Sequence, residues 1–95
     1  MRASINVAKL IFGMNSRKLL QKALDSPQSL RFSEVLKLAE AFGFQLDRIS
    51  GSHHILKCSA IPEILNLQNV RGMAKPYQVR QLIKLVERYN LQLSE

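Results

Sequence analysis

The stretch that decides the fold is residues 44–58, which read Phe44-Gln45-Leu46-Asp47-Arg48-Ile49-Ser50-Gly51-Ser52-His53-His54-Ile55-Leu56-Lys57-Cys58. Apolar residues recur through 44–49 and 53–58, and small turn residues separate the two runs, so we predict two antiparallel strands joined by a tight turn. A third strand is predicted over residues 64–68, where apolar and polar residues alternate from Leu65 onward. Together these runs predict a three-stranded antiparallel sheet.

Three helices are predicted around this sheet. The first covers residues 16–24, and the second is expected to have Ser33 as its N-cap, Glu34 in its first turn and Gly43 at its end. The third begins at Pro76, whose fixed φ suits a first helical position, and runs to about residue 88 or 89. The order helix, helix, strand, strand, strand, helix predicts an α+β fold with the helices packed on one face of the sheet.

Size and charge limit the classes of function. A chain of 95 residues forms one domain whose core is too small for a deep, enclosed active site, so a substrate must be bound on an open surface. The chain has 14 Lys and Arg residues against 7 Asp and Glu residues, and its net charge of +7 attracts polyanions. Nucleic acid is therefore the first candidate partner, and an acidic protein surface is the second.

The first 13 residues are interpreted separately from the rest of the chain. Residues 1–13 are interpreted as an N-terminal extension, because Met14 is a second candidate start directly before the first predicted helix, and residues 14–95 then form a single domain. The apolar run of the extension is interrupted by Lys9 and lacks a signal-peptide cleavage site, and no segment approaches membrane-spanning length. We therefore expect a cytoplasmic protein without a membrane partner.

The sequence predicts neither a cofactor nor a metal. Its single cysteine, Cys58, excludes an intrachain disulfide and a cysteine-rich zinc site, favours a reducing compartment, and is expected to be a buried strand residue. Phosphate-loop, dinucleotide-binding and zinc-binding patterns do not occur in the sequence.

The adjacent residues His53 and His54 are the first candidates for acid–base chemistry. Histidine is the only side chain whose unperturbed pKa lies near neutrality. Consecutive strand residues point to opposite faces of a sheet, so at most one of the two rings faces a given substrate unless the strand bulges. The alternative is that both are ordinary strand residues, one solvated and one packed.

A second candidate site lies just before the last helix. Arg71 and Lys75 flank Gly72 beside a helix N-terminus, where free N–H groups favour phosphate. Within the predicted helix, Arg80, Lys84 and Arg88 follow at intervals of four residues and form one basic row. Arg80 is the member of this row nearest to Arg71 and Lys75. The alternative is a row of solvated surface charges.

Two motifs together carry a family resemblance. They are Arg48-Ile49-Ser50-Gly51-Ser52-His53-His54-Ile55-Leu56 and Gly72-Met73-Ala74-Lys75-Pro76-Tyr77-Gln78-Val79-Arg80-Gln81-Leu82. With them, the sequence from about Met14 to Glu95 resembles the HicA family of bacterial toxin-antitoxin systems, in particular longer members whose final helix begins with Ala-Lys-Pro-Tyr-Gln. Shorter members begin close to their first helix, so residues 1–13 depart from the family pattern and leave the assignment of Met1 as the start open.

The resemblance implies a fold similar to double-stranded-RNA-binding domains. It also implies a toxin that acts as a metal-independent endoribonuclease (an mRNA interferase) on mRNA and is neutralised by a HicB-type antitoxin. The catalytic histidine of the family directly follows the Gly-Ser pair, which implies His53, and Lys75 lies where related domains bind phosphate. The residues expected to bind RNA are Gly51, Ser52, Lys57, Arg71, Lys75 and Arg80.

One histidine can fill only one proton-transfer role at a time, so a second proton carrier is required. The substrate ribose, Lys57 and water are the candidates. Two other classes of function fit the same residues: a non-catalytic module that binds double-stranded RNA, and a protein-interaction domain whose basic face meets an acidic partner.

Overall fold

The computed structural model describes residues 15–94, which form three α-helices, a 3₁₀ turn and one antiparallel sheet. The predicted extension, residues 1–13, lies outside the described residues. In chain order the elements are α2 (Ser16–Asp25), η1 (Pro27–Ser29), α3 (Phe32–Ala41), β1 (Phe44–Ser50), β2 (His53–Cys58), β3 (Ile64–Val70), β4 (Met73–Ala74) and α4 (Pro76–Tyr89). The predicted α+β class is confirmed.

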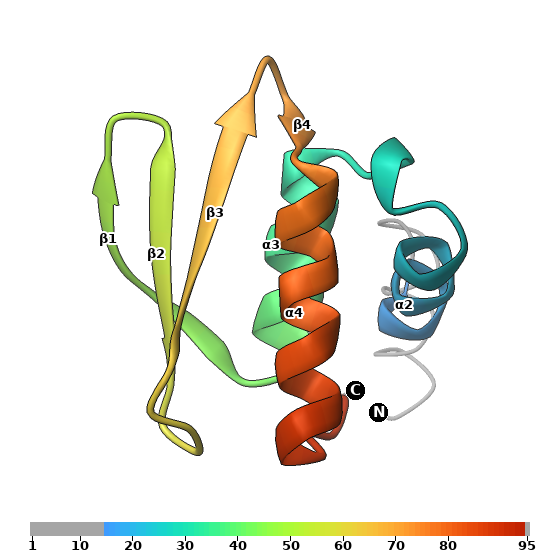
Figure 1. The fold of residues 1–95 in the computed structure, drawn as a ribbon, viewed down its shortest axis with the longest axis vertical. Helices are drawn as coiled ribbons and strands as arrows, with labels where there is room; N and C mark the ends of the chain where they lie inside the picture. The colour runs from blue at the N-terminus through green and yellow to red at the C-terminus, as the bar shows by residue number, and fades with distance from the viewer. Residues whose placement is uncertain (1–14, 95) are drawn as a thin grey trace, which may run out of the picture.

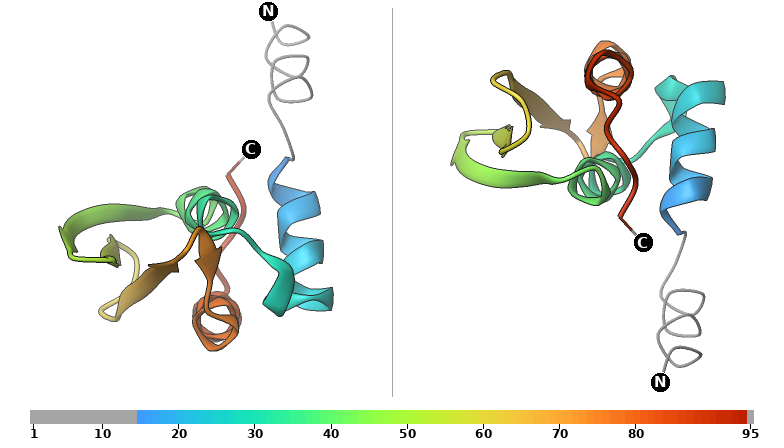
Figure 2. Two further views of the ribbon diagram at one scale, coloured as in Figure 1. Left: turned by 90° about the horizontal axis from the view of Figure 1, so that it is seen from above. Right: turned by 90° about the horizontal axis from the view of Figure 1, so that it is seen from below.

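The elements are stacked in layers. The sheet has the order β1-β2-β3-β4 with all neighbours antiparallel, and α3 and α4 pack on one of its faces (Figure 1). Helix α2 lies on the far side of α3 and α4 from the sheet, as the views along the vertical axis show (Figure 2). Within residues 15–94, no helix covers the other face of β1, β2 and β3, which we call the uncovered face.

The core lies between the helices and the covered face of the sheet. It is built from the apolar side of each predicted helix together with Leu56, Cys58, Leu65 and Leu67 of the two central strands. Cys58 is buried as predicted. The residues of β2 with even numbers therefore point to the helices, and those with odd numbers point to the uncovered face.

The predicted strand count is wrong by one short strand. Residues 71 and 72 form a two-residue hairpin turn, in which Arg71 and Gly72 have φ values of 54° and 85°, and Val70 then pairs with Met73. Met73 also forms a bridge to Arg31 on its other side. The loop expected here therefore becomes β4, because it is held between β3 and the segment before α3.

The predicted N-cap of the second helix is also wrong. Helix α3 begins at Phe32, with Arg31 as its N-cap residue, because the Phe32 ring is needed in the core. Glu34 lies in the first turn as predicted, and its Oε1 accepts a hydrogen bond of 2.9 Å from the Arg31 amide. Burial tends to raise the pKa of Glu34, but this hydrogen bond and the ammonium of Lys22 in α2, 3.0 Å away, outweigh it, so the pKa lies below its ordinary value.

Strand β1 is the edge of the sheet and contains a bulge. The register with β2 shifts between Leu46 and Arg48, which leaves Asp47 without a partner in the ladder. Its carboxylate lies 3.1 Å from the Arg48 guanidinium and 3.5 Å from the Lys57 ammonium. All residues of β1 except Phe44 are exposed.

Candidate functional site

His53 and His54 lie next to each other at the start of β2 but on opposite faces of the sheet, as strand alternation predicts. The His54 ring is on the covered face, where it meets the Phe32 ring edge-on with 4.6 Å between centroids. Its buried Nδ1 has no hydrogen-bond partner within residues 15–94, so this ring acts as a packing group. The His53 ring is on the uncovered face and is half-buried.

Asn66 of β3 orients the His53 ring. It pairs with Ile55 in the sheet, which places it diagonally across from His53, and its Oδ1 is 3.1 Å from His53 Nδ1. An amide oxygen can only accept a hydrogen bond, so in the neutral imidazole this partner places the proton on Nδ1 and leaves the lone pair on Nε2. The nitrogen that faces away from Asn66 is therefore the one able to take a proton from a bound molecule.

The turn before His53 is held by β3. Gly51 has a φ of 60°, the conformation that a two-residue turn of type II′ requires at its first central position. The Ser52 hydroxyl accepts a hydrogen bond of 3.1 Å from Gln68 Nε2. The backbone carbonyl of Ser52 accepts another, of 2.9 Å, from the backbone N–H of Asn69. These two bonds from β3 to Ser52 thus hold in place the start of β2, where His53 is the first residue.

The start of α4 is held at the same strand. Gln78 is only 3% exposed. Its side-chain Oε1 accepts a hydrogen bond of 2.7 Å from the backbone N–H of Gln68. Pro76 is the first helical residue as predicted, and Lys75 is the N-cap. Gln68 therefore links the turn before His53 with the first turn of α4.

Fewer amides are free at this helix N-terminus than the sequence analysis expected. Pro76 has no N–H group, and the amides of Gln78 and Val79 both donate to the Lys75 carbonyl, at 3.0 and 3.1 Å. Within residues 15–94, the Tyr77 amide is the one N–H of this turn for which no partner is found. Anion binding here would therefore depend chiefly on side-chain cations.

Several predicted site residues come together at one end of the molecule. The turn with Gly51 and Ser52, the hairpin tip with Arg71 and the first turn of α4 with Lys75 lie at the upper end in Figure 1. Arg71 and Arg80 are exposed and Lys75 is half-buried, and none of the three has an acidic partner within the described part of the chain.

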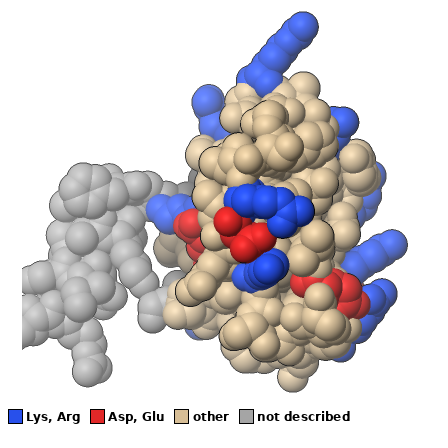
Figure 3. All heavy atoms as spheres, turned by 90° about the vertical axis from the view of Figure 1, so that its left-hand side faces the viewer, with Lys and Arg blue, Asp and Glu red and all other residues tan. Residues whose placement is uncertain are grey.

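Two other cations are placed differently. Lys57 is four residues from His53 along β2, about 13 Å at the rise of a strand, and its ammonium faces Asp47. Arg88 in the last turn of α4 lies 3.0 Å from Glu63. On the face in Figure 3, basic and acidic side chains meet at the centre, whereas basic side chains project alone at the upper end.

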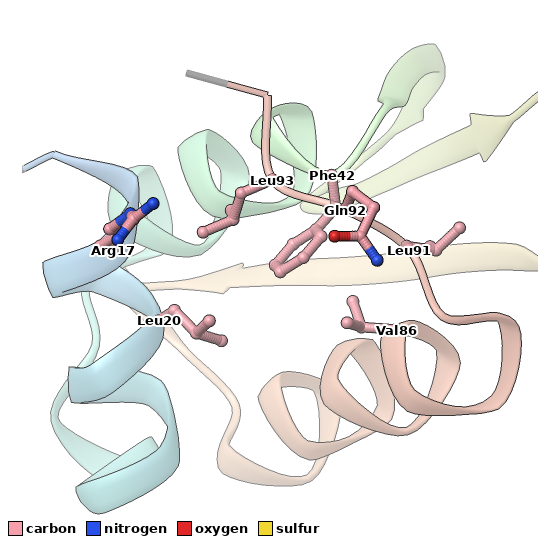
Figure 4. A pocket seen from close by; sticks show the side chains of 7 residues that line it. All are labelled: Arg17, Leu20, Phe42, Val86, Leu91, Gln92 and Leu93. Atoms are coloured by element: carbon pink, nitrogen blue, oxygen red, sulfur yellow. The ribbon is translucent and has the colours of Figure 1, made fainter.

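The candidate site is an open surface. A hollow of about 580 Å³ lies elsewhere, between α2, α4 and the C-terminal segment, and is lined by Arg17, Leu20, Phe42, Val86, Leu91, Gln92 and Leu93 (Figure 4). A second hollow of about 450 Å³ borders Lys57 at the far end of β2. Neither contains His53 or Lys75.

No cluster of three or more His, Cys, Asp or Glu side chains suited to a metal occurs within residues 15–94. None of the helices described there has the length and apolar character needed to span a membrane.

Sequence reasoning missed the partners of the predicted residues. Asn66, Gln68 and Gln78 hold the two halves of the site, and two of them could have been found, because residues 66 and 68 are the polar positions of the alternating strand. Gln78 gave no such signal, since it lies on the apolar side of a helix.

Comparison with known proteins supplies the family. Residues 32–88, more than half of the chain, match the family described as HicA toxin of bacterial toxin-antitoxin. Searches of curated proteins and of solved structures gave no match. The matched region runs from the start of α3 to the end of α4 and so contains every residue of the candidate site. The chain therefore belongs to the HicA toxin family of bacterial toxin-antitoxin systems.

Proposed function

We propose that this toxin is a metal-independent endoribonuclease, an mRNA interferase, with His53 as its catalytic histidine. The observation that carries the proposal is the His53 ring on the uncovered face of the sheet, oriented by Asn66 at 3.1 Å. The other histidine is packed against Phe32 and faces away from that surface. The net charge of +7 adds attraction for a polyanion.

The reaction follows from the tautomer. Nε2 of His53 takes the proton of a ribose 2′-hydroxyl, the 2′-oxygen attacks the adjacent phosphorus, and the bond from phosphorus to the 5′-oxygen breaks. The products are a 2′,3′-cyclic phosphate and a 5′-hydroxyl. Cations stabilise the charge that develops on the phosphate.

The leaving 5′-oxygen needs a proton. Lys57 was one candidate donor, but it lies about 13 Å along the strand from His53 and faces Asp47. Water or a substrate hydroxyl fits better, so a single well-placed histidine is expected to contribute about 10²- to 10⁴-fold. The proposal is thus a modest catalyst.

The partners follow from the family. A HicA toxin has a cognate antitoxin, and we infer that here it is a HicB-type protein, with mRNA as the target. Gly51, Ser52, Arg71, Lys75 and Arg80 are the proposed RNA contacts.

The test compares wild type with His53→Ala. We expect the variant to lose growth inhibition on induced expression and RNA cleavage in purified form, while its melting temperature and RNA affinity stay nearly unchanged. His54→Ala is the control, because it removes the histidine on the covered face, and it should retain cleavage. Wild-type cleavage by His53→Ala would refute the assignment and favour a non-catalytic RNA-binding module.

The pH dependence of RNA cleavage by Asn66 variants tests whether Asn66 is a positioning residue for His53. Asn66→Leu removes the acceptor and should lower kcat more than it raises KM. Asn66→Asp keeps an acceptor but adds a negative charge next to His53, so the acid limb of the pH profile should move up by about one unit or more. A profile that stays in place would show that Asn66 does not act through His53.

A further inference from the structure

Tyr77 is an aromatic side chain without a packing role. Of the Phe and Tyr rings within residues 15–94, Phe32, Phe42 and Phe44 are buried in the core, and the Tyr89 hydroxyl donates to Glu63 at 2.6 Å. Tyr77 is 57% exposed. A tyrosine contributes to stability mainly by burying its ring, so the fold does not explain this one.

The ring has polar and charged neighbours. The Lys75 ammonium lies over it, 5.8 Å from the ring centroid, within the range of a cation–π contact. Gln78 Nε2 lies 3.4 Å from the Tyr77 hydroxyl. The ring stays open enough to receive a flat molecule, because more than half of the residue is exposed with the ammonium already over it.

Hydrogen bonds link the Tyr77 hydroxyl to strand β3 beside the proposed catalytic turn. Gln78 binds the Gln68 amide, and Gln68 is the residue of β3 that pairs with His53. The Tyr77 hydroxyl is therefore connected through the Gln78 side chain to the backbone of Gln68, the strand position opposite His53. The first turn of α4, which carries this ring, lies at the same end of the molecule as the turn before His53, although α4 packs on the other face of the sheet (Figure 1).

We infer that Tyr77 is a stacking platform for one unpaired base of RNA, with Lys75 binding a neighbouring phosphate. The inference rests on the proposed function and narrows its substrate to single-stranded segments. Exposed aromatic rings beside cations bind single-stranded nucleic acid in this way, since every base has a flat face. Bases of a duplex are stacked on each other and cannot reach such a ring.

The surface around Tyr77 suits a different kind of RNA from the one that domains of similar fold bind. Domains of similar fold bind duplex RNA by its shape, through phosphates and 2′-hydroxyls. Arg71 and Lys75 alone would suit that mode, because charges do not distinguish paired from unpaired strands. The exposed ring of Tyr77 adds a contact that only an unpaired base can use.

The first experiment places a fluorescent reporter at the ring. The chain has no tryptophan, so Tyr77→Trp in the His53→Ala background gives a protein with one tryptophan that cannot cleave by the proposed route. An unstructured oligoribonucleotide should quench its emission on binding. A blunt-ended RNA duplex, which has no unpaired bases, and an abasic oligonucleotide, which offers phosphates without bases, should bind without quenching.

The second experiment measures affinity in the same background. Tyr77→Ala should weaken binding of the unpaired RNA roughly 5- to 150-fold, the range for loss of one base stack, and leave binding of the blunt-ended duplex unchanged. Tyr77→Phe, which keeps the ring, should bind like the parent. Melting temperatures show whether each variant is folded.

The outcomes separate this inference from the proposed function. Because binding is measured without cleavage, unchanged affinity of Tyr77→Ala for unpaired RNA overturns the stacking role even if wild type cleaves RNA. The same holds if Tyr77→Ala weakens the antitoxin complex alone, which would assign the ring to the partner interface. If neither RNA binds any variant, the proposed function fails together with the inference.

Discussion

Replacing Arg71 with asparagine is expected to make the protein more stable and, at the same time, a weaker RNA binder. The φ of 54° at Arg71 lies in the left-handed region, which costs an ordinary side chain about 1–2 kcal/mol. Asparagine tolerates this region, and Arg71→Asn creates the Asn-Gly pair favoured in two-residue hairpins with both central φ values positive. Since asparagine relieves part of that cost, we expect a gain of about 0.5–1 kcal/mol in the free energy of unfolding.

Melting temperature and RNA affinity are measured on the same preparations. A domain of this size gains about 4–8 °C per kcal/mol, so the expected rise is roughly 2–8 °C. Loss of the guanidinium should remove one phosphate contact and reduce the slope of log affinity against log salt by about 0.7–0.9. Arg71→Lys is the matched control, because it keeps both the charge and the unfavourable φ, and it should resemble wild type in both measurements.

Each half of this prediction has its own refutation. If Arg71→Asn melts no higher than Arg71→Lys, the hairpin does not store the expected strain. If the salt slope is the same for both, Arg71 makes no phosphate contact, and its conformation has no explanation in RNA binding.

Three further predictions concern other parts of the chain. Lys75→Ala should weaken RNA of every sequence alike and reduce the salt slope by about 0.7–0.9, whereas Arg88→Ala, which breaks a surface ion pair, should leave the slope unchanged; equal slopes for the two variants would contradict the phosphate assignment. Glu34→Gln should lower stability by about 1 kcal/mol at neutral pH; because the folded-state pKa of Glu34 is lowered, its contribution is present above the unfolded-state pKa and is lost as pH falls through the folded-state pKa, so the melting temperatures should converge in acid. We also propose residues 14–95 as the functional domain, so a chain that starts at Met14 should melt and inhibit growth like the full chain; a large loss of stability would instead show that residues 1–13 contribute to the fold.

The central hairpin could be predicted because its information is local. The apolar run within 53–58 and the Gly51-Ser52 pair before it are sufficient to define β2, whose observed limits, His53–Cys58, are those predicted. The fourth strand could not be predicted in the same way, because Arg-Gly is not a favoured hairpin pair and β4 depends on the distant bridge to Arg31. The Ser33 cap failed because Phe32 is required in the core one residue earlier.

The candidate site could be predicted in the residue types that it brings to the surface but not in their connections. His53 and Lys75 carry recognisable chemistry, whereas the role of Asn66 depends on the register of β3 against β2, which places it diagonally across from His53. Lys57 shows the opposite error: it shares a face with His53 by alternation, but distance along the strand and the bulged Asp47 separate the two. Shared orientation in a strand does not imply proximity.

The bulge in β1 also has a consequence for self-association. A seven-residue edge strand with exposed amides is a template on which a second copy could add its own edge and begin an aggregate. The register shift at Asp47 interrupts that template, and pairing there would remove water from the charged side chains of Asp47 and Arg48. Leu46 and Ile49 are exposed on that strand, but the irregular edge presents them without the continuous backbone ladder that an aggregate would extend.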